Sequence, residues 1–380
     1  MPEPFKNLVN PALVRAAVAP LARAWPAFDG ARFVALGCDG LEALELKARA
    51  MQVADALEAT LPQDFAAACD VIEAALAPAG PQDMAQPGEL HDGLRGWILW
   101  SAGEFIARRG LQQPERALAA LHAITQRFTA EFAIRPFIVA HPDLVFATLA
   151  RWCRDPSAQV RRLVSEGSRP RLPWGLRLQA LVRDPSPTLP LLAALQDDDS
   201  EDVRRSVANH LNDIAKDHPA LVVRWLEQHL PGATPERRAL LRHACRTLIK
   251  QGHPQVLHAW GLGQAFKGTA ALRVAPARVA LGGEITLTLA LHSASTKPQR
   301  LAVDYAMHHV KADGRTTPKV FKGWQLELPA KGSVTLSRRH SLRPVTTRRY
   351  HAGRHGVAVQ VNGRVVGEAT FMLTIPKGAA

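Results

Sequence analysis

Two segments, DPSAQVRRLVSEG at residues 155–167 and DDSEDVRRSVANH at residues 198–210, align with each other at an offset of 43 residues. The matched positions are an acid, a serine, a valine and an Arg-Arg pair: Asp155 and Asp198, Ser157 and Ser200, Val160 and Val203, Arg161-Arg162 and Arg204-Arg205. Self-similarity at a fixed period indicates a chain built from stacked structural repeats. The sequence therefore predicts a repeat architecture for this region.

The type of repeat follows from the period and from the pattern of apolar and turn residues around it. Residues 41–61 and 113–132 place apolar side chains at helical spacing, and short Asp-Pro turns separate such stretches. A period near 43 falls within the range of about 40–47 residues of HEAT and armadillo repeats. In each unit we expect an Asp or Ser to cap the second helix, Val and Leu to face the core, and the arginines to project from an exposed ridge. Residues 131–138, EFAIRPFI, are a fainter copy.

The pattern changes near residue 268. Residues 273–293 alternate apolar and polar side chains, and later runs continue at the spacing of strands. Asn362-Gly363 stands between two such runs, which is a strong hairpin signal. About seven short strands indicate an immunoglobulin-like β-sandwich without its cysteine pair. The predicted fold is mainly α with a smaller all-β domain: a HEAT-like α-solenoid over residues 1–265, followed by the sandwich over residues 270–380.

Charge is distributed unevenly along the chain. Residues 270–380 hold 17 Lys and Arg against 5 Asp and Glu, a net +12 of the chain's +13. Such asymmetry favours a polyanionic partner, nucleic acid before membrane. The four cysteines are far apart, and neither a signal peptide nor a membrane span is visible. We expect a cytoplasmic monomer that needs no metal or cofactor.

Three carboxylates stand in basic, polar surroundings that we expect to be helix starts: Glu131, Glu166 and Asp213. Arg205, Asn209 and Asp213 are spaced at i, i+4 and i+8, so they share one side of a helix, with Asn212 and Lys216 beside them. Acids near arginines commonly form salt bridges or caps. Alternatively, an acid on a surface that binds a polyanion indicates that a cationic ligand binds there, because phosphates alone would repel the acid.

An alkylated base is a cationic ligand of this kind. Methylation at N3 or N7 of a purine creates a positive charge, and loss of the base leaves an oxocarbenium-like sugar. Carboxylates stabilise both species and can orient a water for attack on C1′. The electron-rich face of Trp174 would attract the same charge. The alternative for Trp174 is a wedge packed behind Pro173 between two repeats.

The segments EFAIRPFI, VRRLVSEGSRPRLPWG and VRRSVANHLNDIAKDHP, with PEPFKN at the start, resemble the bacterial AlkC-type DNA alkylation repair glycosylases, which are HEAT-like repeat proteins related to the AlkD type. The basic tail is similar to that of the members with an immunoglobulin-like domain. The resemblance implies hydrolysis of the N-glycosidic bond of 3-methyladenine and 3-methylcytosine in duplex DNA, with the base left in the helix. It implies Glu131, Glu166, Trp174 and Asp213 as active-site residues.

Duplex DNA with alkylated bases is thus the expected partner, met at the nucleoid and not at a membrane. Candidate contacts in the helical part are Arg161, Arg162, Arg169, Arg171, Arg204, Arg205, Asn209 and Lys216. Candidates in a clamp formed by the sandwich are Arg338, Arg339, Arg348, Arg349 and Arg354. Two other interpretations stay open: a HEAT scaffold without catalysis, which binds nucleic acid or a protein, and a DNA-binding regulator, which the absence of a helix-turn-helix pattern disfavours.

Overall fold

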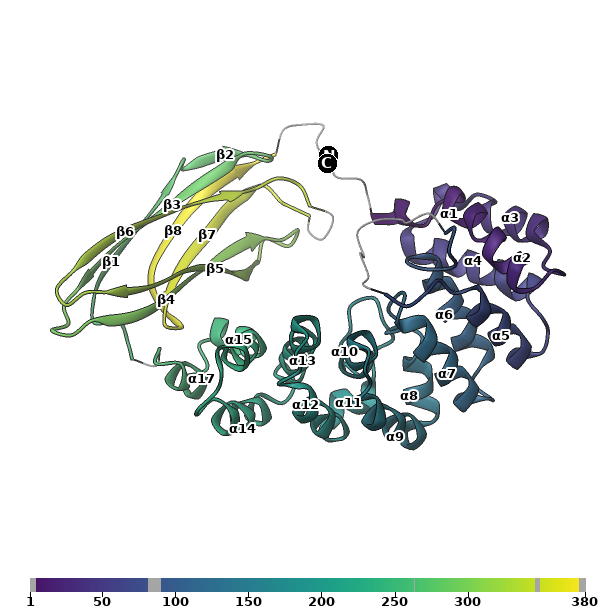
Figure 1. Ribbon diagram of the computed structural model, residues 1–380. Coiled ribbons are helices and arrows are strands. Elements are labelled where there is room, and N and C mark those ends of the chain that lie inside the picture. The colour runs from purple at the N-terminus through teal and green to yellow at the C-terminus, as the bar shows by residue number, and fades with distance from the viewer. Residues whose placement is uncertain (1–4, 81–89, 263, 346–348, 376–380) are drawn as a thin grey trace. The chain divides into compact units, whose positions relative to one another are not determined.

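The computed structural model describes residues 5–80, 90–262, 264–345 and 349–375. Helices fill the first part of the chain and strands the last (Figure 1). The chain divides into two compact units, Met1–Asp217 with Thr234–Ala244, and His218–Ala233 with Cys245–Ala380. None of the helices in the described ranges is both long and apolar enough to cross a membrane.

The first unit is a stack of short helices. Its α-helices are α1 (Pro11–Ala16), α2 (Val18–Ala24), α3 (Gly30–Cys38), α4 (Leu46–Thr60), α5 (Phe65–Ala75), α6 (Ile98–Arg109), α7 (Pro114–Thr125), α8 (Arg135–Ala140), α9 (Pro142–Trp152), α10 (Ala158–Gly167), α11 (Gln179–Arg183), α12 (Leu189–Leu195), α13 (Glu201–Ile214) and α15 (Pro235–Ala244). Three 3₁₀ turns accompany them, η1 (Phe5–Leu8), η2 (Leu41–Ala43) and η3 (Ser186–Thr188). Helix α10 packs on α13, and α13 packs on α15, so these three form one row (Figure 1). The predicted HEAT-like solenoid is confirmed.

The 43-residue repeat is also a repeat of hydrogen bonds. Asp155 Oδ1 accepts the N–H of Ser157 at 2.8 Å, and Asp198 Oδ1 accepts the N–H of Ser200 at 2.9 Å. Ser157 and Ser200 occupy the N-cap positions of α10 and α13, but neither side chain makes a capping hydrogen bond. The acid therefore shapes the turn that starts each second helix, and the serine only marks the cap position. The predicted apolar positions are fully buried: Val160, Leu163, Val203 and Val207.

The helix predicted within residues 113–132 is shorter than its pattern suggests. Helix α7 ends at Thr125, and residues 131–134 form a turn before α8. Pro136 lies in the first turn of α8, where proline is tolerated, whereas it would disrupt the interior of one helix that continued from α7. Glu131 consequently lies in a turn and not in a helix.

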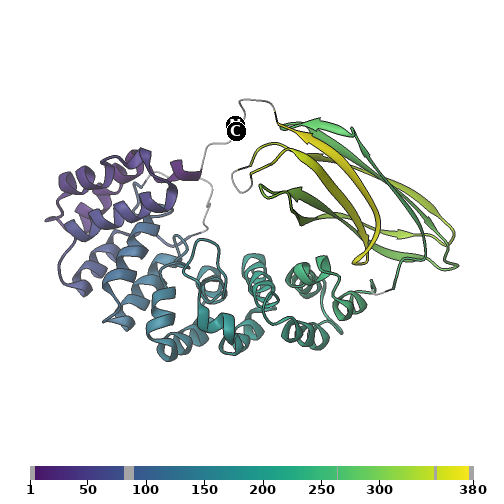
Figure 2. The same cartoon turned by 180° about the vertical axis from the view of Figure 1, so that it is seen from behind.

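The second unit contains α14 (Pro219–His229), α16 (Arg246–Lys250), α17 (Pro254–Ala259) and a two-layered set of strands. The strands are β1 (Gly268–Ala275), β2 (Arg278–Ala280), β3 (Glu284–Ser293), β4 (Gln299–Val310), β5 (Thr316–Leu328), β6 (Ser333–Ser341), β7 (Gly353–Val361) and β8 (Arg364–Thr374). One sheet has the order β1-β3-β6 and the other β2-β8-β7-β4-β5 (Figure 1 and Figure 2). Alternate residues of β3, β4 and β7 fill the core between the sheets. The predicted sandwich is confirmed.

The predicted hairpin joins β7 to β8 through Asn362 and Gly363, both in the left-handed region, with φ of 50° and 76°. The Asn362 side chain also fixes neighbouring segments, since its Oδ1 accepts the N–H of Ala302 at 2.9 Å and its Nδ2 donates to the carbonyl of Gln264 at 2.9 Å. A turn that requires two positive φ values explains why Asn-Gly occurs here.

The change from helix to strand falls where the sequence predicts it, between Ala259 and Gly268. The two compact units divide the chain at other positions, because α14 and the helices after Cys245 belong with the strands. The assignment of residues 1–265 and 270–380 as the functional domains stays a prediction.

Candidate active site

Glu166 and Asp213 lie at the ends of their helices, so the expectation that they stand at helix starts is wrong. Glu166 is the penultimate residue of α10, and Asp213 is the penultimate residue of α13. The C-terminus of a helix carries partial negative charge and disfavours an anion. Both carboxylates therefore occupy positions that do not favour helix stability, and each needs a nearby cation.

Arg169 supplies that cation to both carboxylates at once. Its Nη1 donates to Glu166 Oε1 at 2.6 Å, and its Nε donates to Asp213 Oδ2 at 2.9 Å. Burial disfavours the charged guanidinium, but attraction by Glu166 and Asp213 outweighs it and raises the pKa of Arg169 above its ordinary value. The three side chains are all buried. Arg169 thus joins the ends of two adjacent repeats through one charged group.

Two further groups complete the contacts of these carboxylates. Ser206 Oγ donates to Glu166 Oε2 at 2.5 Å, and Lys216 Nζ donates to Asp213 Oδ1 at 2.8 Å. Every oxygen of the pair thereby has a partner, which fixes the orientation of both carboxylates. We call Glu166, Arg169, Ser206, Asp213 and Lys216 the carboxylate cluster.

Glu131 belongs to a neighbouring ion pair and not to this cluster. Its Oε2 accepts from Arg162 Nη1 at 3.0 Å and from Thr129 Oγ1 at 2.7 Å. Its backbone nevertheless approaches the end of α10, because a Cβ added to Gly167 would lie 4.0 Å from the Glu131 carbonyl oxygen and only 2.6 Å from Ile134 Cγ2. A glycine at 167 allows the turn that carries Glu131 to come this close. The turn that carries Glu131 therefore lies against the C-terminal end of α10, and all three predicted carboxylates are near enough to buried Arg135 to attract its charge.

Trp174 does not pack as a wedge between repeats. The residue is 65% exposed, and its φ of 62° places a bulky side chain in the left-handed region. That conformation costs about 1–2 kcal/mol for a residue other than glycine. Leu176, two residues later, is also exposed. The loop after α10 therefore presents an indole to solvent in a strained conformation, a combination common at functional sites.

The first arginine of each repeated pair serves the repeat itself. Arg161 Nη1 donates to the carbonyl of Asp155 at 2.9 Å, and Arg204 Nη1 donates to the carbonyl of Asp198 at 2.5 Å. Arg161 also pairs with the carboxylate of Asp198, at 2.6 Å from Nε to Oδ2. The expectation that these arginines project freely from a ridge is thus wrong for Arg161 and Arg204, because both guanidinium groups turn back onto the loop before their helix.

The other helical arginines are paired as well, although they differ in exposure. Arg171 pairs with Asp217, at 2.7 Å from Nε to Oδ2, and Arg205 pairs with Glu201 one turn away on α13. The Arg205 pair is largely exposed, with 61% of the arginine side chain accessible. Since exposed ion pairs contribute little free energy, Arg205 can exchange its partner at low cost, whereas buried Arg169 cannot.

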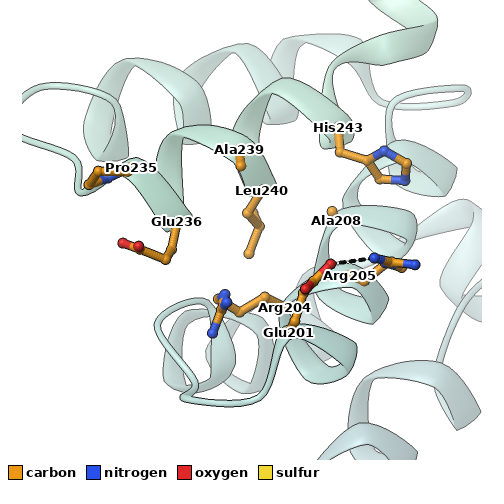
Figure 3. A pocket seen from close by; sticks show the side chains of 9 residues that line it. All are labelled: Glu201, Arg204, Arg205, Ala208, Pro235, Glu236, Ala239, Leu240 and His243. Carbon is orange, nitrogen blue, oxygen red and sulfur yellow. Dashed lines mark hydrogen bonds and ion pairs between the residues drawn. The ribbon is translucent and has the colours of Figure 1, made fainter.

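A pocket of about 440 Å³ lies between α13 and α15, at the end of this row of helices (Figure 3). Arg204 and Glu236 stand on one side of it, and the Glu201–Arg205 ion pair and His243 stand on the other (Figure 3). Its remaining lining is apolar: Ala208, Pro235, Ala239 and Leu240. None of the three carboxylates is among the lining residues, so this hollow is not the centre of the candidate site. Asn209, next to Ala208 on α13, contacts His243, with 3.0 Å between Oδ1 and Nε2.

The arginines predicted for the sandwich do not share one surface. Arg338 and Arg339 are adjacent on β6, so their side chains leave opposite faces of the sheet. Arg338 lies over the ring of Trp324 at 5.3 Å, whereas Arg339 is 78% exposed and pairs with Glu284 at 3.4 Å. The remaining three are Arg354, which is exposed on β7 of the other sheet, Arg349, which is exposed after β6, and Arg348, which lies outside the described residues.

Two buried residues near the carboxylate cluster were not predicted from the sequence. His210 is fully buried, its Nδ1 is 3.0 Å from the carbonyl of Ser165, and burial lowers its pKa to about 4. Arg135 is fully buried below the loop that carries Trp174, and its Nε donates to the carbonyl of Leu176 at 2.5 Å. Arg135 stands in the quoted segment EFAIRPFI, but an arginine before a proline in an apolar run carries no signal that it is buried.

Comparisons with known proteins agree with this architecture. A family model described as the C-terminal Ig-like domain of the uncharacterised protein YhaZ matches residues 268–375. Uncharacterized protein YhaZ of Bacillus subtilis (strain 168) is 34% identical over 371 residues, which cover 97% of this chain and 99% of that protein. The structure of Pseudomonas fluorescens alkylpurine DNA glycosylase AlkC bound to DNA containing an abasic site analog is 35% identical, with a TM-score of 0.89, and the match covers 98% of this chain and 100% of that chain. The resemblance found in the sequence is confirmed, and this chain belongs to the family that contains AlkC and YhaZ.

Proposed function

We propose that this protein is a DNA glycosylase that removes cationic alkylated bases, 3-methyladenine and 3-methylcytosine, from duplex DNA. The observation that carries the proposal is that Glu166 and Asp213, at the ends of two stacked helices, share Arg169, and that the loop after α10 exposes a strained Trp174. The similarity along the whole chain to a protein named an alkylpurine DNA glycosylase supports the reaction class and the DNA partner.

The proposed chemistry uses side chains of the chain and one water. The bond between C1′ and the ring nitrogen breaks, and its electron pair moves to the cationic base, which leaves neutral. The sugar becomes an oxocarbenium ion, and the oxygen of a water then bonds to C1′ while one proton of that water passes to the carboxylate that orients it and from there to solvent. Glu166 and Asp213 stabilise the sugar cation and orient the water, and Glu131 supports them. A leaving group that already carries positive charge does not need protonation.

Arg169 and Lys216 prepare the carboxylates for this role. They hold Glu166 and Asp213 in fixed directions by charge-assisted hydrogen bonds, at 2.6–2.9 Å. Because the partners are in place before substrate arrives, no reorganisation is needed when positive charge develops on the sugar. Trp174 packs against the deoxyribose or the base, where its ring face attracts the cation.

The proposed base stays in the duplex and is approached from the minor groove, in contrast to enzymes that extrude their target base. An enzyme that extrudes its target base needs a pocket beside its catalytic groups. The pocket between α13 and α15 does not fit that role, because none of the three carboxylates lines it. Exposed arginines of the helical unit, such as Arg205, and of the sandwich, such as Arg339 and Arg354, contact phosphates.

Single-turnover release of 3-methyladenine and 3-methylcytosine from methylated duplex DNA tests the assignment. We expect Glu166→Gln and Asp213→Asn to lower the rate about 10²- to 10³-fold, because each removes a charge that stabilises the sugar cation. Glu201→Gln is the matched control, since Glu201 is an exposed carboxylate paired to an arginine on the same α13. Excision at the parent rate by both cluster variants, with unchanged DNA binding, would remove these carboxylates from the chemistry.

A scaffold without catalysis is the second candidate function. The observation that favours it is that each carboxylate already has an arginine partner: Glu131 with Arg162, and Glu166 and Asp213 with Arg169. The same assay separates the two functions, because a scaffold would bind duplex DNA and release no base from it.

A further inference from the structure

The loop between α10 and α11, residues 168–178, carries Trp174 at its tip, and we call it the Trp174 loop. Its base is fixed by Leu172 and Leu178, which are 6% and 2% exposed, and by a hydrogen bond from the N–H of Leu178 to the carbonyl of Pro170 at 3.2 Å. These contacts hold the flanks of the loop. They do not explain what keeps Trp174, at the tip of the loop, in the left-handed conformation.

Arg135 bonds the chain on both sides of that tip, at the last residue of α10 and within the loop. Its Nη1 donates to the carbonyl of Gly167 at 2.7 Å, and its Nε donates to the carbonyl of Leu176 at 2.5 Å. A guanidinium is planar and rigid, so two bonds from one group fix the separation and direction of the two carbonyls. Gly175 adds a steric contact, because a Cβ there would lie 3.2 Å from Arg135 Nε and 3.0 Å from Leu172 Cδ2. The tip therefore rests directly on the Arg135 side chain.

This arrangement is costly for an ordinary structural arginine. Arg135 is fully buried, and no carboxylate of the described residues lies within ion-pair distance of it. Burial lowers its pKa to about 10, with repulsion from Arg169 adding to the effect. The group still carries its proton at neutral pH and keeps all its N–H donors. A buried cation whose partners are backbone carbonyls is retained at a free-energy cost, which indicates a positional role for it.

We propose that Arg135 is a positioning residue that holds the Trp174 loop, so that the indole of Trp174 stands in one fixed orientation beside the carboxylate cluster. The proposal rests on the proposed function for the meaning of that orientation. The proposal goes further because it names the buried group that sets the orientation of the indole. That orientation can be measured without an assay of catalysis.

The experiment uses the full chain labelled with 5-fluorotryptophan and observed by ¹⁹F NMR. The protein has eight tryptophans, and the resonance that disappears in Trp174→Phe identifies Trp174. We expect Arg135→Met to move or broaden the Trp174 resonance, because the tip then lacks both hydrogen bonds. Arg135→Lys, which keeps the charge and can bond one carbonyl, should give an intermediate change.

Two further variants separate positioning from general damage. Gly175→Ala keeps every hydrogen-bonding group of Arg135 and places a methyl 3.0 Å from Leu172 Cδ2 and 3.2 Å from Arg135 Nε, so it should perturb the same resonance. If Arg135→Met fails to fold, Arg135→Lys decides, since residue 175 adjoins Trp174 and its substitution also acts directly on the indole. Arg49→Met is the matched control, since Arg49 is another buried arginine that ties backbone carbonyls, those of Leu44, Lys6, Val9 and Glu42, elsewhere in the same unit. It should lower stability and leave the Trp174 resonance in place.

The activity arm measures single-turnover excision and affinity for undamaged duplex. We expect Arg135→Met and Gly175→Ala to slow excision about 10- to 100-fold, as a displacement near 1 Å in an active site does, with affinity for undamaged duplex unchanged. A Trp174 resonance that stays at the parent position and width in Arg135→Met and in Arg135→Lys would overturn the proposal. If the parent protein releases no base, the proposed function fails, and the NMR arm still decides whether Arg135 positions the loop.

Discussion

Trp174 combines two properties that a residue selected for stability would not have, a large exposed apolar side chain and a φ of 62°. Glycine adopts this backbone conformation without strain. We therefore expect Trp174→Gly to leave the free energy of unfolding unchanged or raise it by up to about 1 kcal/mol, and to lower base excision strongly.

Denaturant unfolding beside single-turnover excision measures both effects of this substitution. Trp174→Ala is the control, because alanine removes the indole and keeps the backbone strain. A clear drop in stability for Trp174→Gly would show that the indole packs on the protein, contrary to its exposure.

His210 makes stability depend on pH. The folded state holds this histidine neutral, with a pKa of about 4 against an ordinary value of 6.5, because it is buried. The unfolded chain binds a proton on it below about pH 6.5, so the free energy of unfolding should fall as pH drops from about 6.5 towards 4. We expect His210→Gln to be less stable overall, since the substitution disrupts the hydrogen bond with the Ser165 carbonyl, but to show a shallower pH dependence in this window.

Chemical denaturation at a series of pH values tests this. His91→Gln, at an exposed histidine of the same unit, is the control for removing a histidine as such. Equal slopes in His210→Gln and the parent would contradict a lowered pKa at this histidine.

At the scale of the element, Arg161 of the first repeat and Arg205 of the second have partners that differ in burial. Arg161 bonds the loop before its own helix and a carboxylate of the next repeat, Asp198, whose side chain is 5% exposed. Arg205 pairs instead with an exposed acid on its own helix, Glu201. We expect Arg161→Gln to cost about 1–3 kcal/mol of unfolding free energy, and Arg205→Gln to stay within about 0.5 kcal/mol.

Thermal or urea unfolding of these two variants compares the positions directly. DNA affinity should show the reverse order, with the larger decrease in Arg205→Gln, because only that guanidinium can leave its partner at low cost. Equal decreases in the free energy of unfolding would show that Arg161 and Arg205 contribute equally to stability, contrary to this expectation.

Element-level features were predictable where they depend on neighbours in the sequence. The offset of 43 residues located the second helices, and Asn362-Gly363 located the β7–β8 hairpin. The grouping of Glu131, Glu166 and Asp213 was expected only through the family resemblance. The bridge from Arg169 to Glu166 and Asp213 and the burial of Arg135 were not predictable, because each depends on segments that meet only after the repeats stack.

At the scale of the whole molecule, the net charge of +12 in residues 270–380 predicts where salt dependence arises. We expect the double substitution Arg339→Gln with Arg354→Gln to reduce the slope of log affinity against log salt by about 1 for each arginine–phosphate pair that it removes. The excision rate at saturating protein should be unchanged, because neither residue belongs to the carboxylate cluster.

Binding to undamaged duplex over a range of salt concentrations measures the slope. Arg300→Gln is a control, since Arg300 is an exposed arginine of the same unit that pairs with Glu327 at 3.5 Å. A slope that stays at the parent value would place the phosphate contacts elsewhere.

The strained backbone at Trp174 has a kinetic consequence for the search that a glycosylase must make. Undamaged sites outnumber lesions by many orders of magnitude, so any refolding of a loop at each site would be repeated at every one of them. With the Trp174 loop held by Arg135 as proposed, that conformational cost is confined to the folding of the protein. Each encounter with DNA can then be brief, and the enzyme can reject normal base pairs at the speed of diffusion along the duplex.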